Sequence, residues 1–284
     1  KIVVISVPRQ SGKTTLLRAI AVQQMIAHRR REIYYTAQTG KDARARWNQL
    51  VDQVELDRGL RSRFAIRKSA GDANIMHTRT RSRFAPFAPT PESLHGYTPH
   101  VVMVDEAFSQ NEVEGTLLMG AIQPAQMTIL DRQIYIVSTK GTAESTWFHG
   151  WVEAARAGEP GIALIEYAAA PGVNVYDPDT WETFHPVAGT SRWPMIREAI
   201  AEAARTVPRS EFERGYANRP TLTAGHLIAD ELWSPLNSIT EPTTGDRRAI
   251  TFDVAHDLSA ATLTLSWLPR NERFDSKLHH RIIK

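Results

Sequence analysis

The sequence predicts an α/β fold built around a parallel sheet, and three observations support this class. Residues 2–5 form an unbroken run of β-branched apolar side chains, as expected for a strand that is buried on both faces. Apolar residues then recur every three to four positions over residues 16–25, which predicts a helix with one buried face. Two later apolar runs, at residues 101–104 and 133–137, end in polar residues, and parallel α/β sheets bind ligands at such strand ends.

The composition is that of a globular protein. Of the 284 residues, 42% are hydrophobic and 23% are charged, and this length fits one large domain or two. No apolar run reaches the roughly 18 residues that indicate a membrane-spanning helix, and no signal peptide is visible. Cysteine is absent, which excludes disulfides and thiolate metal sites. The net charge of +3 permits a nucleic-acid partner without indicating one.

The segment between the first strand and the first helix, residues 7–15, reads VPRQSGKTT. Gly-Lys-Thr at the start of a helix that follows a strand is typical of a phosphate-binding loop. Gly12 lets the backbone approach phosphates, Lys13 can reach the β- and γ-phosphates, and the Thr14 hydroxyl can bind Mg²⁺. The usual pattern has a glycine where Val7 stands, so a surface turn is the alternative. The predicted nucleotide-binding residues are Arg9, Gln10, Ser11, Gly12, Lys13, Thr14 and Thr15.

The second strand is predicted at residues 33–37, before a polar loop and a helix through Trp47. The following residues, up to Pro86, read as short strands in which arginines alternate with Thr and Ser. Period two places Arg79, Arg81 and Arg83 on one face of the sheet. This face is either a phosphate-contacting surface or a solvated edge strand that charge protects. The arginines are also candidates for reaching the nucleotide of a neighbouring subunit.

Two adjacent acids follow the apolar strand at residues 101–104. With a phosphate-binding loop upstream, Asp105 fits the acid that holds Mg²⁺ through water, and Glu106 fits the base that polarises the attacking water. The alternative is an ordinary strand that ends in a helix-capping Asp. Ser138 and Thr139 end the next strand, where they are expected beside the γ-phosphate and can pass its loss to another element. A plain strand-to-helix turn is the alternative for these two residues.

Further elements follow along the chain. Helical periodicity predicts helices at residues 146–157 and 195–207, and an apolar run predicts a strand at residues 162–167. Residues 212–244 are rich in loop-forming residues, including three prolines, and indicate a linker.

After the linker, the pattern resets to a meander with strands predicted at residues 249–254, 260–267 and 277–283. Asp253 lies on the first of these strands and Asp257 in the turn that follows. Nucleases of the ribonuclease H-like class begin in this way, with the first acid as a metal ligand; a structural Asp in a hairpin is the alternative. The chain starts and stops inside predicted strands, so we expect it to be part of a longer protein.

In their order and spacing, these motifs resemble the large terminase subunit of tailed bacteriophages, the motor that packages DNA into proheads. Residues 8–14 resemble the terminase form of the phosphate-binding loop, in which a basic residue sits early and the first glycine is dispensable. Residues 93–96 resemble the loop that precedes the terminase acidic strand, and residues 101–106 resemble that strand with its Asp-Glu pair. Residues 138–141 resemble the coupling motif, and residues 216–220 resemble the segment that leads into the linker.

The resemblance implies a RecA-like P-loop ATPase core with a parallel sheet, followed by the opening strands of a ribonuclease H-like nuclease domain. The implied domains are an ATPase domain at residues 1–210, a linker or subdomain at 211–247 and the start of the nuclease at 248–284. The family has an adenine-contacting segment before the first strand and further nuclease carboxylates on later strands, and neither is among these residues. The implied enzyme is an ATPase with a metal-dependent endonuclease domain that is incomplete in this chain.

The resemblance also implies roles for single residues. Glu106, Arg9 and Asp253 are the implied catalytic residues, with Arg9 as a cis arginine finger or ATP sensor. The implied coupling residues are Ser138 and Thr139. The implied metal ligands are Thr14 and Asp105 for the Mg²⁺ that accompanies ATP, and Asp253 and Asp257 for Mg²⁺ or Mn²⁺ in the nuclease.

The implied function is ATP-driven translocation of double-stranded viral DNA into a prohead, with endonucleolytic cutting of concatemeric DNA by the C-terminal domain. The implied partners are double-stranded DNA, the portal protein and the small terminase subunit. The chain itself is expected to form a homo-oligomeric ring on the prohead, and no membrane is implied as a partner. The implied location is the cytoplasm of a bacterial host.

Two other functions are open at this point. A helicase or another nucleic-acid-translocating P-loop ATPase shares the same core. A helicase needs a second RecA-like domain, however, where this sequence predicts a meander. A non-catalytic nucleotide-binding regulator would lack a hydrolytic glutamate, whereas Glu106 is present.

Overall fold

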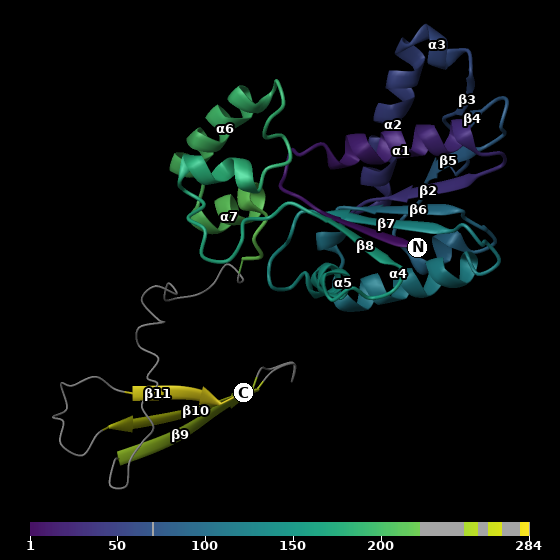
Figure 1. Cartoon of the computed structure of the whole chain (residues 1–284). Coiled ribbons are helices and arrows are strands. Elements are labelled where there is room, and N and C mark those ends of the chain that lie inside the picture. Colours follow the sequence, from purple (N-terminus) through teal and green to yellow (C-terminus); the bar gives the residue numbers. More distant parts are fainter. Residues whose placement is uncertain (70, 222–246, 255–260, 269–278, 284) are drawn as a thin grey trace. The chain divides into compact units, whose positions relative to one another are not determined.

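The computed structural model describes residues 1–69, 71–221, 247–254, 261–268 and 279–283 (Figure 1). The chain divides into two compact units, Lys1–Ala224 and Gly225–Lys284, each with its own sheet. The predicted turn with Asp257 lies outside the described residues.

A sheet of eight strands forms the centre of the first unit, in the order β3-β4-β5-β2-β6-β7-β1-β8. The strands from β5 to β8 in this order pair in parallel, whereas β4 pairs antiparallel with both β3 and β5. The predicted α/β class is therefore confirmed. The strands are β1 (Ile2–Ser6), β2 (Glu32–Thr36), β3 (Phe64–Arg67), β4 (Asn74–His77), β5 (Arg83–Pro86), β6 (Val101–Asp105), β7 (Gln133–Ser138) and β8 (Ile162–Glu166).

Helices cover both faces of this sheet (Figure 1), because successive strand residues point to opposite faces. Tyr35 of β2 belongs to the core that contains Trp47 of α2, whereas the adjacent Tyr34 belongs to the core that contains Leu118 of α4. None of the described helices is long and apolar enough to cross a membrane. The helices are α1 (Lys13–Ala27), α2 (Gly40–Leu56), α3 (Arg58–Arg61), α4 (Glu112–Ala125), α5 (Thr146–Arg156), α6 (Trp193–Thr206) and α7 (Arg209–Ala217).

A third core lies within the first unit, in residues 169–217, which we call the helical lobe. Trp181 and Phe212 are fully buried in it. The rings of Tyr176 and Tyr216 stack on Phe212, with centroids 4.9 and 5.2 Å apart. The aromatic side chains in this part of the sequence therefore build a local core.

The prediction of a linker from residue 212 is wrong at its start. Residues 212–217 are the last turns of α7, whose buried residues are Phe212, Gly215 and Ala217. A helix of this length shows too few turns for its periodicity to stand out in a sequence, and packing stabilises it more than propensity does. Its anchor is Phe212, which the sequence pattern placed in a loop.

The prediction that Arg79, Arg81 and Arg83 share one sheet face is also wrong. Residues 78–80 are a turn and Arg81 has a left-handed backbone (φ 63°), so only Arg83 lies in a strand. The intervening Thr80 and Ser82 are buried, and their hydroxyls donate to carbonyls at the end of α1 (2.6 Å each). The arginines alternate with Thr80 and Ser82 because these two hydroxyl residues are buried in a turn, and not because the segment is a strand.

The second unit contains an antiparallel sheet in the order β11-β10-β9. Its strands are β9 (Arg247–Val254), β10 (Ala261–Leu268) and β11 (His279–Ile283), which confirms the predicted meander. Asp253 lies in β9, opposite Thr262 of β10.

Candidate nucleotide-binding site

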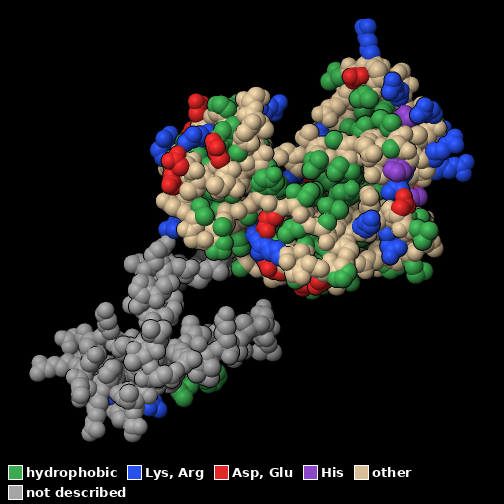
Figure 2. Space-filling model, viewed as in Figure 1, with side chains coloured by type: hydrophobic (Ala, Val, Ile, Leu, Met, Phe, Trp, Pro, Cys, Tyr) green, Lys and Arg blue, Asp and Glu red, His purple; other side chains and the backbone are tan. Residues whose placement is uncertain are grey.

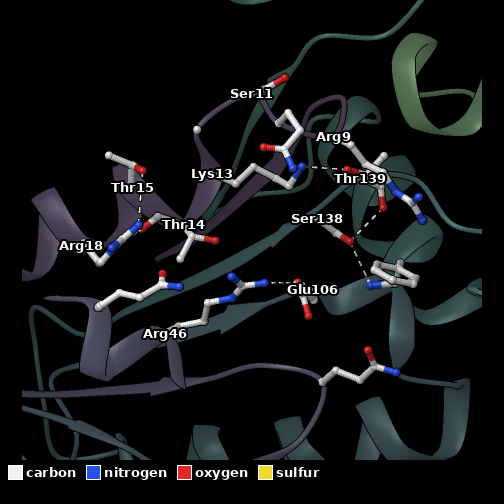
Figure 3. A pocket seen from close by; sticks show the side chains of 15 residues that line it. Arg9, Ser11, Lys13, Thr14, Thr15, Arg18, Arg46, Glu106, Ser138 and Thr139 are labelled. Atoms are coloured by element: carbon white, nitrogen blue, oxygen red, sulfur yellow. Dashed lines mark hydrogen bonds and ion pairs between the residues drawn. The ribbon is translucent and has the colours of Figure 1, made fainter. Parts of the chain in front are cut away.

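A cavity of about 400 Å³ opens at the carboxyl ends of β1, β6 and β7 (Figure 3). The loop between β1 and α1 forms one wall, and the ends of β6 and β7 lie opposite. All seven predicted nucleotide-binding residues line it, together with Glu106 and both predicted coupling residues. The lining residues are Arg9, Gln10, Ser11, Gly12, Lys13, Thr14, Thr15, Arg18, Gln38, Arg46, Gln49, Glu106, Phe108, Ser138 and Thr139.

The start of α1 leaves hydrogen-bond donors facing this cavity. Gly12 is the N-cap residue in a left-handed conformation (φ 81°), which glycine adopts readily, and no side chain caps the helix. The first N–H groups of a helix have no acceptor within the helix. The buried Ser11 hydroxyl also has no partner among the described residues. Such an array at a helix N-terminus fits a phosphate group.

Lys13 reaches across the loop to the end of β7. Its Nζ donates to the Pro8 carbonyl and to Thr139 Oγ1, both at 2.7 Å. Burial lowers the pKa of Lys13 to about 8; the Asp105 carboxylate opposes this shift, and the Arg9 guanidinium adds to it. Within the described residues, the Nζ atom donates only to neutral oxygen atoms. A bound phosphate would give the ammonium group the anionic partner that its burial calls for.

The Asp105 side chain is buried, and its carboxylate accepts three hydrogen bonds. Its Oδ2 accepts from Thr14 Oγ1 (2.7 Å) and from the Tyr35 hydroxyl (2.8 Å), and its Oδ1 accepts from the backbone N–H of Glu106 (2.9 Å). Burial and the adjacent Asp105 carboxylate raise the pKa of Tyr35, which keeps its hydroxyl protonated as a donor. The carboxylate is thereby fixed in place beside the first turn of α1.

The Thr14 hydroxyl and the Asp105 carboxylate fit a magnesium ion that accompanies a nucleotide. Both are hard oxygen donors, and they already lie within hydrogen-bond distance of each other. Within the part of the chain that the structure describes, no group of three or more His, Asp or Glu side chains forms a metal site. Nucleotide-associated Mg²⁺ usually takes one or two protein oxygens plus phosphate oxygens and water, so these two residues suffice.

Glu106 follows Asp105 in a left-handed conformation (φ 54°). Such a backbone costs on the order of 1 kcal/mol for a residue other than glycine, and it is commonest at functional sites. The Glu106 Oε1 atom lies 3.4 Å from Nη2 of Arg46, which extends from α2. The Glu106 side chain is 29% exposed, so water can reach its carboxylate.

Ser138 and Thr139 connect the loop to the segment after Glu106. The Ser138 hydroxyl accepts from the Phe108 N–H (3.0 Å) and donates to the Thr139 carbonyl (2.8 Å). The Ser138 carbonyl accepts from the N–H of Val7 (3.1 Å). Because Thr139 also accepts a hydrogen bond from Lys13, the end of β7 is joined to the loop between β1 and α1.

Arg9 connects the loop to the helical lobe. Its backbone N–H donates to the Gly215 carbonyl (2.8 Å), and its guanidinium lies 3.9 Å from Oε2 of Glu211 in α7. Half of the Arg9 side chain is exposed. The helical lobe thus contacts the phosphate-binding loop at Arg9, a predicted catalytic residue of that loop.

Sequence reasoning missed several residues of the site, among them the supporting Tyr35 and the lining Arg46 and Arg18. Tyr35 pairs with Met103 in the β2–β6 register, two positions before Asp105, so strand adjacency and period two together would have placed it on the Asp105 face. Arg46 carries no signal beyond its place on the helix after the polar loop. Arg18 donates to the Thr14 carbonyl (3.3 Å) one turn into α1.

The predicted nuclease residues belong to the second unit of the chain. Asp253 lies in the second unit, and its side chain is outside the described part of the chain, as is all of Asp257. Their roles stay predictions.

The chain matches the family model described as terminase large subunit, ATPase domain, over residues 1–148. The large terminase of bacteriophage HK97 is similar in structure, with a TM-score of 0.65 and 20% identity over 99% of this chain and 58% of that one. A large terminase from a thermophilic bacteriophage, in complex with ADP, has a TM-score of 0.56 and 10% identity over 98% of this chain and 62% of its own. The large terminase ATPase domain of Thermus phage P74-26 has a TM-score of 0.50 and 21% identity, over 77% of this chain and 88% of its own. A search of the curated proteins gave no match.

The chain spans 58% of the HK97 large terminase. At these identities, the solved structures support the fold, a mostly parallel RecA-like α/β sheet. The family model covers more than half of the 284 residues and includes the loop, the acidic strand end and the coupling residues. The chain therefore belongs to the terminase large subunit ATPase family.

Proposed function

We propose that this chain hydrolyses ATP in the cavity at the end of the parallel sheet. The observation that carries the proposal is the buried Asp105 carboxylate, which is hydrogen-bonded to Thr14 in the first turn of α1 and followed by a partly exposed glutamate. Lys13 and the first N–H groups of α1 would hold the β- and γ-phosphates. Thr14 and Asp105 would hold Mg²⁺, which withdraws charge from the phosphates when it is bound.

Glu106 is the proposed general base. Its carboxylate would accept a proton from the water whose oxygen attacks the γ-phosphorus, while the bond to the bridging oxygen breaks and ADP leaves with the electron pair. Glu106 must part from Arg46 before it can take up this proton. The ion pair therefore describes the resting site.

Arg9 and Thr139 are the proposed sensors of the γ-phosphate. Arg9 would leave Glu211 to neutralise charge on the transferring group, as a cis arginine finger does. Lys13 would exchange Thr139 for phosphate, which would release the end of β7. Thr139→Ala should then spare nucleotide binding and reduce DNA translocation more than binding, with Ser138 as the second coupling residue.

We propose that hydrolysis drives double-stranded viral DNA into a prohead, in the cytoplasm of a bacterial host. Membership of the terminase large subunit family supports this role. The proposed partners are double-stranded DNA, the portal protein, the small terminase subunit and further copies of this chain in a ring. A motor of this kind grips the phosphate backbone, so its DNA binding should tolerate any sequence and weaken with salt.

We further propose that the chain comprises an ATPase domain that includes the whole of α7 (Arg209–Ala217), a linker between α7 and residue 247, and the start of a nuclease domain at 248–284. Asp253 would be a ligand for Mg²⁺ or Mn²⁺, with Asp257 beside it, in two-metal cleavage of concatemeric DNA. The support is the meander whose first strand, β9, carries Asp253 between Phe252 and Val254. Asp253→Ala in the full-length protein should abolish plasmid cleavage and leave phosphate release intact; cleavage by that variant would make the acid structural.

The proposed ATPase is tested by nucleotide binding and phosphate release in the Lys13→Ala variant. Both should fall together, because Lys13 binds phosphate in the ground state as well as during transfer. Lys41→Ala, at an exposed position at the start of α2, is the matched control and should behave as the parental protein. Parental nucleotide affinity in Lys13→Ala would exclude this cavity as the nucleotide site.

A further inference from the structure

Five exposed arginines gather at the end of the first unit's sheet that is opposite the nucleotide cavity; we call them the basic edge. Arg29 and Arg30 lie in the connection from α1 to β2, Arg63 directly precedes β3, and Arg79 and Arg81 lie in the turn from β4 to β5. All of these positions are at the amino-terminal ends of β2, β3 and β5, or at the carboxyl end of the antiparallel β4. Figure 2 shows Lys and Arg side chains clustered on this side of the unit.

Backbone hydrogen bonds join the three segments of the basic edge. The Arg30 N–H donates to the Thr80 carbonyl (2.9 Å), and the N–H and hydroxyl of Thr78 both donate to the Arg63 carbonyl (2.9 and 3.0 Å). The turn from β4 to β5 is therefore fixed between the other two segments. The arginines stand on a rigid platform rather than on independent loops.

The guanidinium groups of the basic edge are unpaired in the part of the chain that the structure describes. In the described part of the chain, none of the five forms an ion pair or a side-chain hydrogen bond, although all five side chains are exposed. Two nearby acids are already engaged, since Asp131 pairs with Arg31 and Glu32 with Arg83. Burial lowers the pKa of His77 beneath the turn, and the positive charges of Arg79 and Arg63 lower it further. The basic edge is thus an uncompensated positive surface.

Two of the five arginines occupy strained backbone. Arg30 and Arg81 have left-handed conformations (φ 53° and 63°), which glycine or asparagine would adopt with less strain. Among the described residues, neither side chain forms an ion pair or a hydrogen bond that would offset this strain by stabilising the fold. A role outside the chain explains why a charged residue stands at each position.

We propose that the basic edge binds the phosphate backbone of double-stranded DNA. Guanidinium groups bind phosphate oxygens through paired donors, and arginines presented by three separate segments match an extended polyanion better than one small anion. The choice of DNA as the polyanion rests on the proposed function. The existence of the positive surface is independent of that proposal. The ATP cavity and the DNA-binding surface would then lie at opposite ends of one mostly parallel sheet.

The test compares Arg30→Gly/Arg81→Gly with the parental protein, using the full chain and fluorescence anisotropy on a random-sequence duplex. Each lost phosphate contact should lower the slope of log affinity against log salt by about 0.9. The double variant should therefore lose nearly two units of slope, and its affinity should fall most at low salt. Its melting temperature should match or exceed the parental value, because glycine relieves the left-handed strain. Weaker binding by a protein that is no less stable cannot come from misfolding.

The matched control is Arg192→Gln/Arg205→Gln, which removes the same charge from exposed arginines of the helical lobe. It should keep the parental salt slope. A parental slope in Arg30→Gly/Arg81→Gly would overturn the proposal; if DNA packaging then failed as well, the surface would bind a protein instead. DNA-free phosphate release should be unchanged in both variants. An absence of phosphate release in the parental protein would contradict the ATPase proposal and leave the anisotropy comparison valid.

Discussion

Arg46 of α2 and Glu106 after β6 form an ion pair at the rim of the nucleotide cavity, with Nη2 and Oε1 3.4 Å apart. The two side chains are 41% and 29% exposed, so water screens the pair. We propose that the pair holds the Glu106 carboxylate away from the attacking water until the two groups separate.

The Arg46→Gln variant should hydrolyse ATP faster than the parental protein in the absence of DNA. Partly exposed ion pairs contribute up to about 1 kcal/mol, so the expected increase in basal phosphate release is at most about fivefold. Arg44→Gln on the same helix is the control, because Arg44 lies over the Trp47 ring and contacts the Lys68 carbonyl instead. A fall of tenfold or more in Arg46→Gln would show that Arg46 acts on the transferring phosphate rather than on Glu106.

Two glycines of α4 should respond in opposite directions to alanine. A Cβ atom at Gly115 would come within 2.2 Å of the Trp147 ring, whereas one at Gly120 would meet no atom within 4 Å. Gly115→Ala should therefore destabilise the first unit by about 1–3 kcal/mol through overpacking. Gly120→Ala should stabilise it by up to about 1 kcal/mol, because alanine favours the helix. Thermal unfolding of the two variants measures both effects, and equal shifts of the same sign would contradict the α4–α5 packing.

The stability of the first unit should fall in mild acid because of His185. Burial lowers the pKa of His185 to about 4, and the positive charge of Lys13 adds to the shift. Its ring accepts a hydrogen bond from the Val187 N–H (3.3 Å) and packs on Trp193, as a neutral imidazole can. The unfolded chain takes up this proton below about pH 6.5, whereas the folded chain resists it until about pH 4.

Because the unfolded state binds more protons between these values, the free energy of unfolding decreases as the pH falls from 6.5 to 4. The loss assigned to this one group is at most about 3 kcal/mol. His185→Gln keeps an acceptor for Val187 and removes the titration, so its melting temperature should drop less between these pH values. An equal drop in the variant and the parental protein would assign the acid sensitivity to other groups.

The sequence predicted the sheet and the phosphate-binding loop because both leave local signals. The buried strands are β-branched runs, and Lys13, Thr14, Asp105 and Glu106 stand at fixed positions relative to their strands. The carboxyl ends of adjacent parallel strands lie at one edge, so these motifs had to meet there. The observed cavity confirms this proximity.

The residues that the sequence did not predict depend on tertiary contacts. Arg46 reaches Glu106 from a helix 60 positions away, and no local pattern marks that contact. The arginines of the β4–β5 turn alternate like strand residues because buried Thr80 and Ser82 bind the end of α1. Phe212 stands among prolines and glycines, where only the core of the helical lobe shows that it is helical.

The central claim, ATP hydrolysis with Glu106 as the base, is tested most directly by phosphate release in the Glu106→Gln variant. Glutamine keeps the size and polarity of the side chain but cannot accept the proton, so turnover should fall by about 10² or more while nucleotide binding is retained. Glu112→Gln, at an exposed position in the first turn of α4, is the control and should keep the parental rate. Parental turnover in Glu106→Gln would contradict the assignment of the base and, with it, the proposed mechanism.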